Sequence, residues 1–136
     1  MACGWNHTVA LTRKGEVYTW GSGFDGQLGM ADAALDVLTA PRFVSTLMGH
    51  TITTLDAGSK FTVAVTSAGK MFAWGENREG QLALPKSSCV RKPKQIFAPA
   101  MDDDVVTDVA CGWGHVIAKT DSGVFESSRH IAGGLG

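Results

Sequence analysis

The sequence predicts an all-β protein, a partial β-propeller whose four-stranded antiparallel blades recur with a period of 54 residues. Aligning residues 2–29 with 56–83 gives 11 identities in 28 positions without a gap. Aligning residues 2–15 with 110–123 gives 8 identities in 14. Each copy also holds short alternating segments separated by glycine turns, and about four such segments per roughly 50 residues is the pattern of a propeller blade.

Each copy begins with a predicted β-hairpin. In the first copy, Thr-Val-Ala-Leu-Thr at 8–12 alternates with a period of two and is rich in β-branched residues. A break at 13–15 ends in glycine, and 16–20 forms the returning strand. The same hairpin is predicted at 62–74 and again at 116–126.

Extended segments between the hairpins complete the predicted blades. They are expected at 42–47 and 50–58, and again at 94–97 and 104–112. The Ala-rich segment 30–38 is the one place where a single helical turn is expected.

We expect the whole chain, 1–136, to form one partial propeller array. The last copy departs from the pattern, because Ser127 or Ser128 stands where the other copies have a tryptophan. The predicted divisions are a half-repeat, two full repeats and a degenerate partial repeat, at 2–14, 15–68, 69–122 and 123–136.

A longer motif suggests a family. The segments WGSGFDGQLG at 20–29 and WGENREGQLA at 74–83, with CGWNHTVALTRKGEVY before the first, closely resemble repeats of the regulator of chromosome condensation family. The resemblance covers nearly the whole chain and implies a propeller that has seven blades when complete. It also implies the activities of that family, which include exchange factors for small GTPases, chromatin or cytoskeletal adaptors, ligase-associated modules and a plant UV-B receptor.

The recurring residues of this motif are expected to be structural, because a unique active site has no reason to recur in every blade. Tryptophans suit the wedge between neighbouring blades, glycines allow close backbone approach, and glutamines can satisfy open backbone groups. The histidines are expected to hydrogen-bond backbone within a blade. The positions are Gly4, His7, Gly15, Trp20, Gly21, Gly26, Gln27, Gly58, Gly69, Trp74, Gly75, Gly80, Gln81, Gly112, His115 and Gly123.

The phase of the repeat raises the question of closure. The chain starts and stops with the same half of the repeat, whereas propellers of this type close by joining complementary halves of one blade. Stability in repeat arrays comes from stacked neighbours. We therefore expect either a fragment of a longer propeller or an arc whose exposed blade faces are covered by a partner.

Composition restricts the class of protein. With 44% hydrophobic residues, the chain has the composition of a globular protein. Its net charge of −1 gives no overall electrostatic attraction to nucleic acid or to an anionic membrane. It shows neither a membrane-spanning run nor a signal peptide. The cysteines, Cys3, Cys89 and Cys111, are odd in number, and two of them share a repeat slot with Ala57. That slot is expected to be a packing position, and the compartment intracellular and reducing.

Two more specific functions, metal binding and photoreception, are not expected. Cys3 with His7, and Cys111 with His115, have the spacing of metal half-sites, but four residues along a strand would separate the side chains by about 13 Å. The middle repeat lacks both ligands, so no metal and no cofactor are expected. Resemblance to the UV-B receptor implies an arginine between the Trp and His of this motif. This chain has asparagine and glycine there, so a cation–π partner is missing and photoreception is not expected.

Two charged clusters are most simply solvated loops, and the functional alternative is that they contact a protein partner. They are the basic Arg91, Lys92 and Lys94 and the acidic Asp102, Asp103 and Asp104.

No catalytic motif is present: the sequence has no nucleophile elbow, no phosphate-binding P-loop and no HExxH. We therefore expect a non-catalytic scaffold for protein–protein interaction, with protein partners that include a large assembly or a small GTPase. Neither direct nucleic-acid binding nor membrane insertion is expected. The alternative is a guanine-nucleotide exchange factor for a small GTPase, which the resemblance allows and no particular residue requires.

Overall fold

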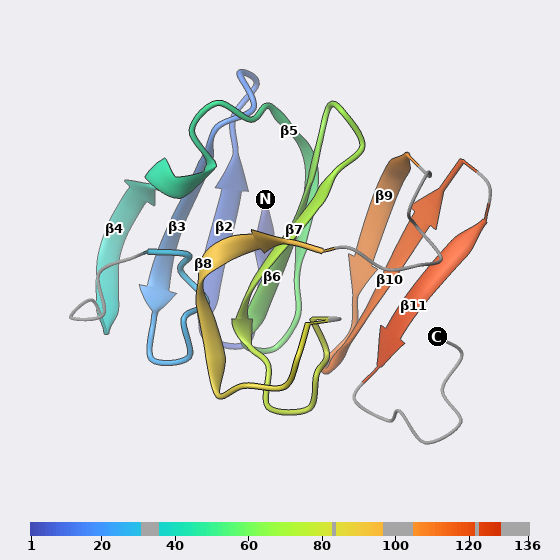
Figure 1. Ribbon diagram of the computed structural model, residues 1–136. Helices are drawn as coiled ribbons and strands as arrows, with labels where there is room; N and C mark the ends of the chain where they lie inside the picture. Colours follow the sequence, from blue (N-terminus) through green and yellow to red (C-terminus); the bar gives the residue numbers. More distant parts are fainter. Residues whose placement is uncertain (31–35, 83, 97–104, 122, 129–136) are drawn as a thin grey trace.

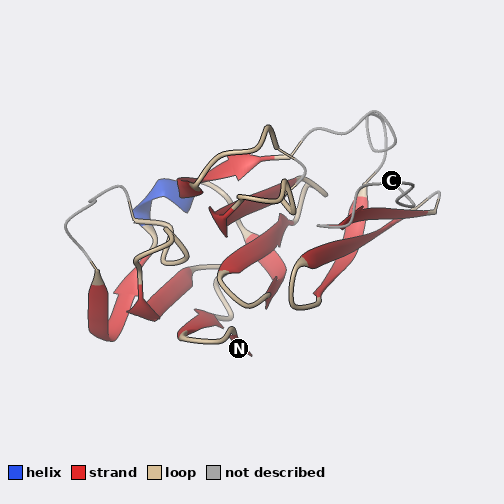
Figure 2. Cartoon of the chain, turned by 90° about the horizontal axis from the view of Figure 1, so that it is seen from below, coloured by secondary structure: helices blue, strands red, loops and turns tan. Residues whose placement is uncertain are grey.

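The computed structural model describes residues 1–30, 36–82, 84–96, 105–121 and 123–128. Three antiparallel sheets follow one another along the chain and lie side by side (Figure 1). Seen from below, they form successive blades of an array (Figure 2). The prediction of an all-β partial propeller with four-stranded antiparallel blades is confirmed.

The sheets are simple meanders in which strand order follows chain order. The first contains β1 (Ala2–Cys3), β2 (His7–Leu11), β3 (Val17–Ser22) and β4 (Val37–Phe43). The second contains β5 (Ile52–Ala57), β6 (Phe61–Thr66), β7 (Met71–Glu76) and β8 (Cys89–Gln95). The third contains β9 (Val106–Cys111), β10 (His115–Thr120) and β11 (Val124–Ser128).

The three predicted hairpins are present, and equivalent strands keep the sequence period. Strands β2, β6 and β10 begin 54 residues apart. Trp20 pairs with Thr8, and Trp74 pairs with Thr62. In the third hairpin Val116, the counterpart of Thr62, pairs with Ser127, so Ser127 and not Ser128 occupies the tryptophan position. The division of the chain into repeats 15–68 and 69–122 stays a prediction.

Two predicted extended segments differ from the structure. Within 42–47, strand β4 ends at Phe43 and Ser45–Leu47 form a short 3-10 helix, η1. One 3-10 turn places residues three apart on the same side, and Val44 and Leu47 are both buried. Strand β8 begins five residues before the predicted segment 94–97, and its proline is tolerated because β8 is an edge strand.

The expected helical turn at 30–38 falls mostly outside the described residues, since 31–35 are not described. Val37 and Leu38, at its end, belong to strand β4. The predicted segments 50–58 and 104–112 contain β5 and β9, as expected.

The core consists of two apolar clusters, one on each side of the middle sheet. Every residue of β6 is buried, because successive side chains point to opposite faces and both faces are covered. Phe61 and Val63 belong to the cluster shared with the third sheet, whereas Ala64 belongs to the cluster shared with the first.

The tryptophans show how blade stacking decides burial. Trp74 is fully buried against the first sheet, and its indole Nε1 donates a 2.9 Å hydrogen bond to the carbonyl oxygen of Gln27. Trp20, at the equivalent place in the first sheet, is only half-buried, since no described sheet lies against that face.

Main-chain hydrogen bonds also join neighbouring sheets at the end that holds the β2–β3 and β6–β7 turns. The amide of Ile52 donates to the Gly15 carbonyl at 3.1 Å, and the amide of Val106 donates to the Gly69 carbonyl at 3.0 Å. Both glycines have a positive φ, which favours glycine over other residues.

Candidate functional site

The same tight turn joins the first two strands of each sheet. Its backbone is closed by a hydrogen bond from a glycine amide to the carbonyl three residues later, at 2.9 Å from Gly4, 2.9 Å from Gly58 and 3.0 Å from Gly112. The ring of the residue that accepts this bond lies over the glycine, and an added Cβ at Gly58 would come within 2.1 Å of Phe61 Cζ. The turn therefore requires glycine for steric reasons.

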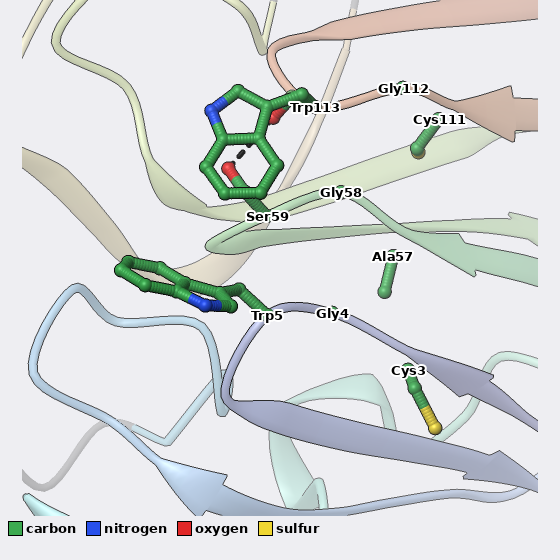
Figure 3. Close-up of a pocket in the computed structure, with 9 residues that line it drawn as sticks. All are labelled: Cys3, Gly4, Trp5, Ala57, Gly58, Ser59, Cys111, Gly112 and Trp113. Atoms are coloured by element: carbon green, nitrogen blue, oxygen red, sulfur yellow. Dashed lines mark hydrogen bonds between the residues drawn. The ribbon is translucent and has the colours of Figure 1, made fainter.

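The three turns lie next to one another because main-chain hydrogen bonds connect them from blade to blade. The Trp5 amide donates to the Ser59 carbonyl at 2.8 Å, and the Ser59 amide donates to the Trp113 carbonyl at 3.3 Å. Ser59 Oγ adds a 2.7 Å bond to the Trp113 carbonyl. Residues 54 apart in the sequence are thus brought side by side at one end of the array (Figure 3).

These turns present an exposed aromatic pair. Trp5 is 64% exposed and Trp113 is 60% exposed, and their ring centroids lie 5.7 Å apart with an interplanar angle of 47°. Next to the rings, the last residues of β1, β5 and β9 and the turn glycines that follow them line an open cavity of about 360 Å³ (Figure 3). Phe24 in the β3–β4 loop is also exposed, and it lies at the same end because successive turns of a meander alternate between ends.

Charged side chains surround the aromatic pair. Lys60 Nζ lies 3.8 Å from Asp25 Oδ2 and 5.2 Å from the centre of the Trp5 ring. Arg78 Nη2 lies 3.8 Å from Asp25 Oδ1. The sequence-based expectation that the cation–π partner is missing is therefore wrong, because the middle repeat supplies Lys60 at the position where the other copies have asparagine and glycine.

The basic cluster predicted as a loop lies in a strand. Arg91, Lys92 and Lys94 are part of β8, the outer edge of the second sheet, where the solvated face and edge can carry charge. Arg91 Nη1 reaches the Gly23 carbonyl at 3.5 Å. The predicted acidic cluster, Asp102, Asp103 and Asp104, lies outside the described residues.

His7 connects two blades, which corrects the expectation of a backbone bond within one blade. The side chain is 3% exposed, and its Nε2 forms a 2.9 Å hydrogen bond with Thr62 Oγ1 in the second sheet. Among the described residues, Nδ1 has no hydrogen-bond partner. Burial lowers the pKa of His7 to about 4, although the nearby Phe61 backbone opposes the shift. At the second boundary, Phe61 and Val116 replace this polar pair with an apolar one.

The predicted geometry of the Cys–x3–His motif is also wrong. Cys3 ends β1 and His7 begins β2, so the two residues lie on paired strands and not along one strand. Ala57 is buried and Cys111 packs against the apolar cluster shared with the third sheet, so the slot is a packing position in these two copies, whereas Cys3 is exposed. Among the described residues, no group of three or more His, Cys, Asp or Glu side chains could hold a metal ion.

All three cysteines are free thiols. Burial, followed by the negative charge of Asp56, raises the pKa of the Cys111 thiol far above its usual range. Within the part of the chain that the structure describes, no helix is long and apolar enough to cross a membrane.

Comparison with known proteins identifies the repeat. Family models of the regulator of chromosome condensation (RCC1) repeat match residues 68–118, and also 1–27 with 52–81. The chain belongs to the regulator of chromosome condensation repeat family. The resemblance inferred from the motif residues is therefore confirmed.

Relatives of different activity share this repeat. The chain is 36% identical over 137 residues to the ultraviolet-B receptor UVR8 of Arabidopsis thaliana, covering 100% of the chain and 30% of the receptor. It is 36% identical over 142 residues to the secretion-regulating guanine nucleotide exchange factor of Mus musculus, again covering 100% of the chain and 30% of that protein. It is 36% identical over 120 residues to the human E3 ubiquitin-protein ligase HERC2, covering 88% of the chain and 2% of the ligase.

Solved structures support the same architecture. Human WBSCR16 superposes with a TM-score of 0.82 at 27% identity, over 93% of this chain and 31% of that one. Yeast Prp20p, studied with Gsp1p and histones, superposes with a TM-score of 0.74 at 27% identity, over 93% and 30%. The chain spans less than a third of the length of each of these relatives.

The aromatic pair and its charged surroundings were missed from the sequence. The signal that could have found them is the alignment at the 54-residue period: positions 5, 59 and 113 are Trp, Ser and Trp, and positions 6, 60 and 114 are Asn, Lys and Gly. These columns vary while their neighbours recur, which indicates side chains that the fold does not require.

Proposed function

We propose that this chain is a non-catalytic module for protein–protein interaction and that it binds its partner at the end of the array that carries Trp5, Phe24 and Trp113. The observation that supports the proposal is the exposure of the two tryptophans, at 64% and 60%, on turns fixed by main-chain hydrogen bonds. Tryptophan is enriched among residues that dominate binding energy, and a rigid backbone lowers the entropic cost of using it. The salt bridges of Asp25 would form part of a polar rim.

The same proposal includes an intracellular setting. Its support is that the three cysteines are free thiols, one of them exposed, as is usual in reducing compartments. Partners would be proteins, since the net charge of −1 gives no general attraction for nucleic acid.

The test uses replacements that the repeat itself supplies. Trp5→Ser and Trp113→Ser each install the residue found at the same turn of the middle blade, so the fold should be retained. Met48→Ser, at a residue that is 70% exposed and follows η1, is the matched control. The tagged chain and its variants are purified from native cells, and retained proteins are measured by mass spectrometry.

A partner retained by the parent chain and by Met48→Ser, but reduced at least about 30-fold by the double tryptophan variant, would support the proposal. Equal retention by all of them would show that this surface is not where partners bind.

A second candidate is guanine-nucleotide exchange on a small GTPase. It is favoured by the 36% identity to the mouse secretion-regulating guanine nucleotide exchange factor. Exchange requires a protein-binding face and no nucleophile, so it is compatible with the same surface. The distinguishing assay is release of a fluorescent nucleotide from a panel of small GTPases: accelerated release would replace the scaffold proposal with exchange.

A further inference from the structure

The first blade boundary contains a complete cation site made by the chain itself. Lys60, from the second sheet, lies 5.2 Å from the centre of the Trp5 ring and 3.8 Å from the Asp25 carboxylate of the first sheet. An aromatic face and a carboxylate together are a favourable environment for a cationic side chain.

At the second boundary the carboxylate is kept, the cation is absent, and Ser59 stands at the position of Trp5. Fifty-four residues after Asp25 and Lys60, the sequence has Glu79 and Gly114. The two loops are built alike, because the Asp25 amide donates to Gln27 Oε1 at 2.8 Å and the Glu79 amide donates to Gln81 Oε1 at 3.1 Å. Glu79 therefore stands where Asp25 stands, while Gly114 has no side chain to reach it.

A pocket occupies the place that this missing side chain would fill. Its volume is about 160 Å³, and Lys60, Glu76, Glu79, Trp113 and Gly114 are among its lining residues. Among the described residues, neither glutamate carboxylate has an ion-pair partner. Trp113, exposed and from the third sheet, provides an aromatic ring at the pocket.

The charge around the pocket is unbalanced by one. Of the charged residues that line it, Glu76 and Glu79 are acidic and Lys60 is basic, and Lys60 already pairs with Asp25 outside the pocket. One added positive charge would balance the group without displacing an existing pair.

We propose that this pocket binds a cationic side chain from a partner protein, with the charge held by Glu79 and Glu76 and the alkyl or guanidinium part against Trp113. Arginine fits better than lysine, because its planar guanidinium can stack on the ring and bridge two carboxylates at once. The inference rests on the proposed interaction function and assigns the chemistry of the partner segment, a basic peptide. Single exposed contacts of this kind are weak, so the pocket contributes selectivity to a larger interface.

The experiment titrates the isotope-labelled full chain with acetylated, amidated Gly-Gly-Arg-Gly-Gly and follows the Trp113 indole N–H and the Glu79 amide by NMR. The matched control peptide carries citrulline, which keeps the shape of arginine and removes its charge. The matched protein control is Glu16→Gln, an exposed carboxylate beside the β2–β3 turn at the other end of the array.

We expect saturable shifts at both probes with the arginine peptide, no saturation with citrulline, and roughly three- to tenfold weaker binding by Glu79→Gln. Gly114→Lys, which places an in-chain cation in the slot, should remove binding. Because that glycine is buried and its replacement could disturb folding, the comparison of Glu79→Gln with Glu16→Gln is decisive.

Equal response to both peptides, or equal binding by Glu79→Gln and the parent chain, would overturn the proposal. The outcome is separable from the interaction function itself. If the tryptophan variants lose their partner while the arginine peptide shows no specific binding, the surface is correct and the cation pocket is wrong.

Discussion

The hydrogen bond between His7 and Thr62 predicts energetic coupling between residues 55 positions apart. Thr62→Val removes the hydroxyl and leaves His7 Nε2 without its partner on a ring that is 3% exposed and already has an unpaired Nδ1. Leaving a buried polar group unsatisfied costs about 1–3 kcal/mol. His7→Phe should cost about 1 kcal/mol, because Thr62 keeps a long 3.4 Å contact to the Gln27 carbonyl.

The double variant should cost less than the sum of the two single changes. It reproduces the Phe61 and Val116 pair of the second boundary, and the phenylalanine would lie over Gly4 as Phe61 lies over Gly58. With no polar atom left unpaired, the coupling free energy should be on the order of 1–2 kcal/mol in favour of the double variant.

The assay is urea unfolding of the parent chain, both single variants and the double variant. A change in midpoint at constant slope reports a change in stability. Single-variant costs that add within about 0.5 kcal/mol would refute the reasoning, because independent sites behave in that way.

Three further predictions concern pH, burial and thiol reactivity. The folded pKa of His7, about 4, is below the unfolded value of 6.5, so the unfolded chain binds more protons between these limits. The free energy of unfolding should therefore be highest above pH 6.5 and should fall by about 3 kcal/mol toward pH 4. Urea midpoints measured across this pH range should show the fall, and the His7→Phe variant should not show it. Trp74→Phe removes a buried hydrogen bond and should lower the free energy of unfolding by about 2 kcal/mol, whereas Trp20→Phe, at a half-buried residue, should lower it by less than about 1 kcal/mol. Equal losses of stability in denaturant titrations would contradict the difference in burial. Iodoacetamide labelling followed by peptide mapping should find Cys3 modified first and Cys111 last, because burial and the charge of Asp56 keep the Cys111 thiol protonated. If Cys111 is labelled faster than Cys3, its thiol is not buried beside Asp56.

Local sequence patterns predicted the hairpins because their causes are local. Alternation of β-branched residues and a glycine at each turn are short-range signals, and the 54-residue period repeats them. Helix η1 and the early start of β8 depend instead on burial of Val44 and Leu47 and on position at a sheet edge. Neither is determined by the residues of the segment alone.

The candidate site was harder to predict because its residues meet only after the blades stack. The alignment shows that position 60 differs from positions 6 and 114, but the contacts of Lys60 with Trp5 and Asp25 cross from one sheet to another. The same limit explains the incorrect expectation for His7, whose partner lies in the next blade.

The main-chain bonds between blades have a consequence for how such a surface can evolve. Each of the two boundaries is tied at both ends by backbone groups, at the turn of Trp5, Ser59 and Trp113 and at the carbonyls of Gly15 and Gly69. Backbone bonds of this kind need no particular side chain at positions 5, 59 and 113. Mutation can therefore explore new partner specificities there while the scaffold stays intact, and duplicated blades can diverge in what they recognise without first having to find a new way to stack.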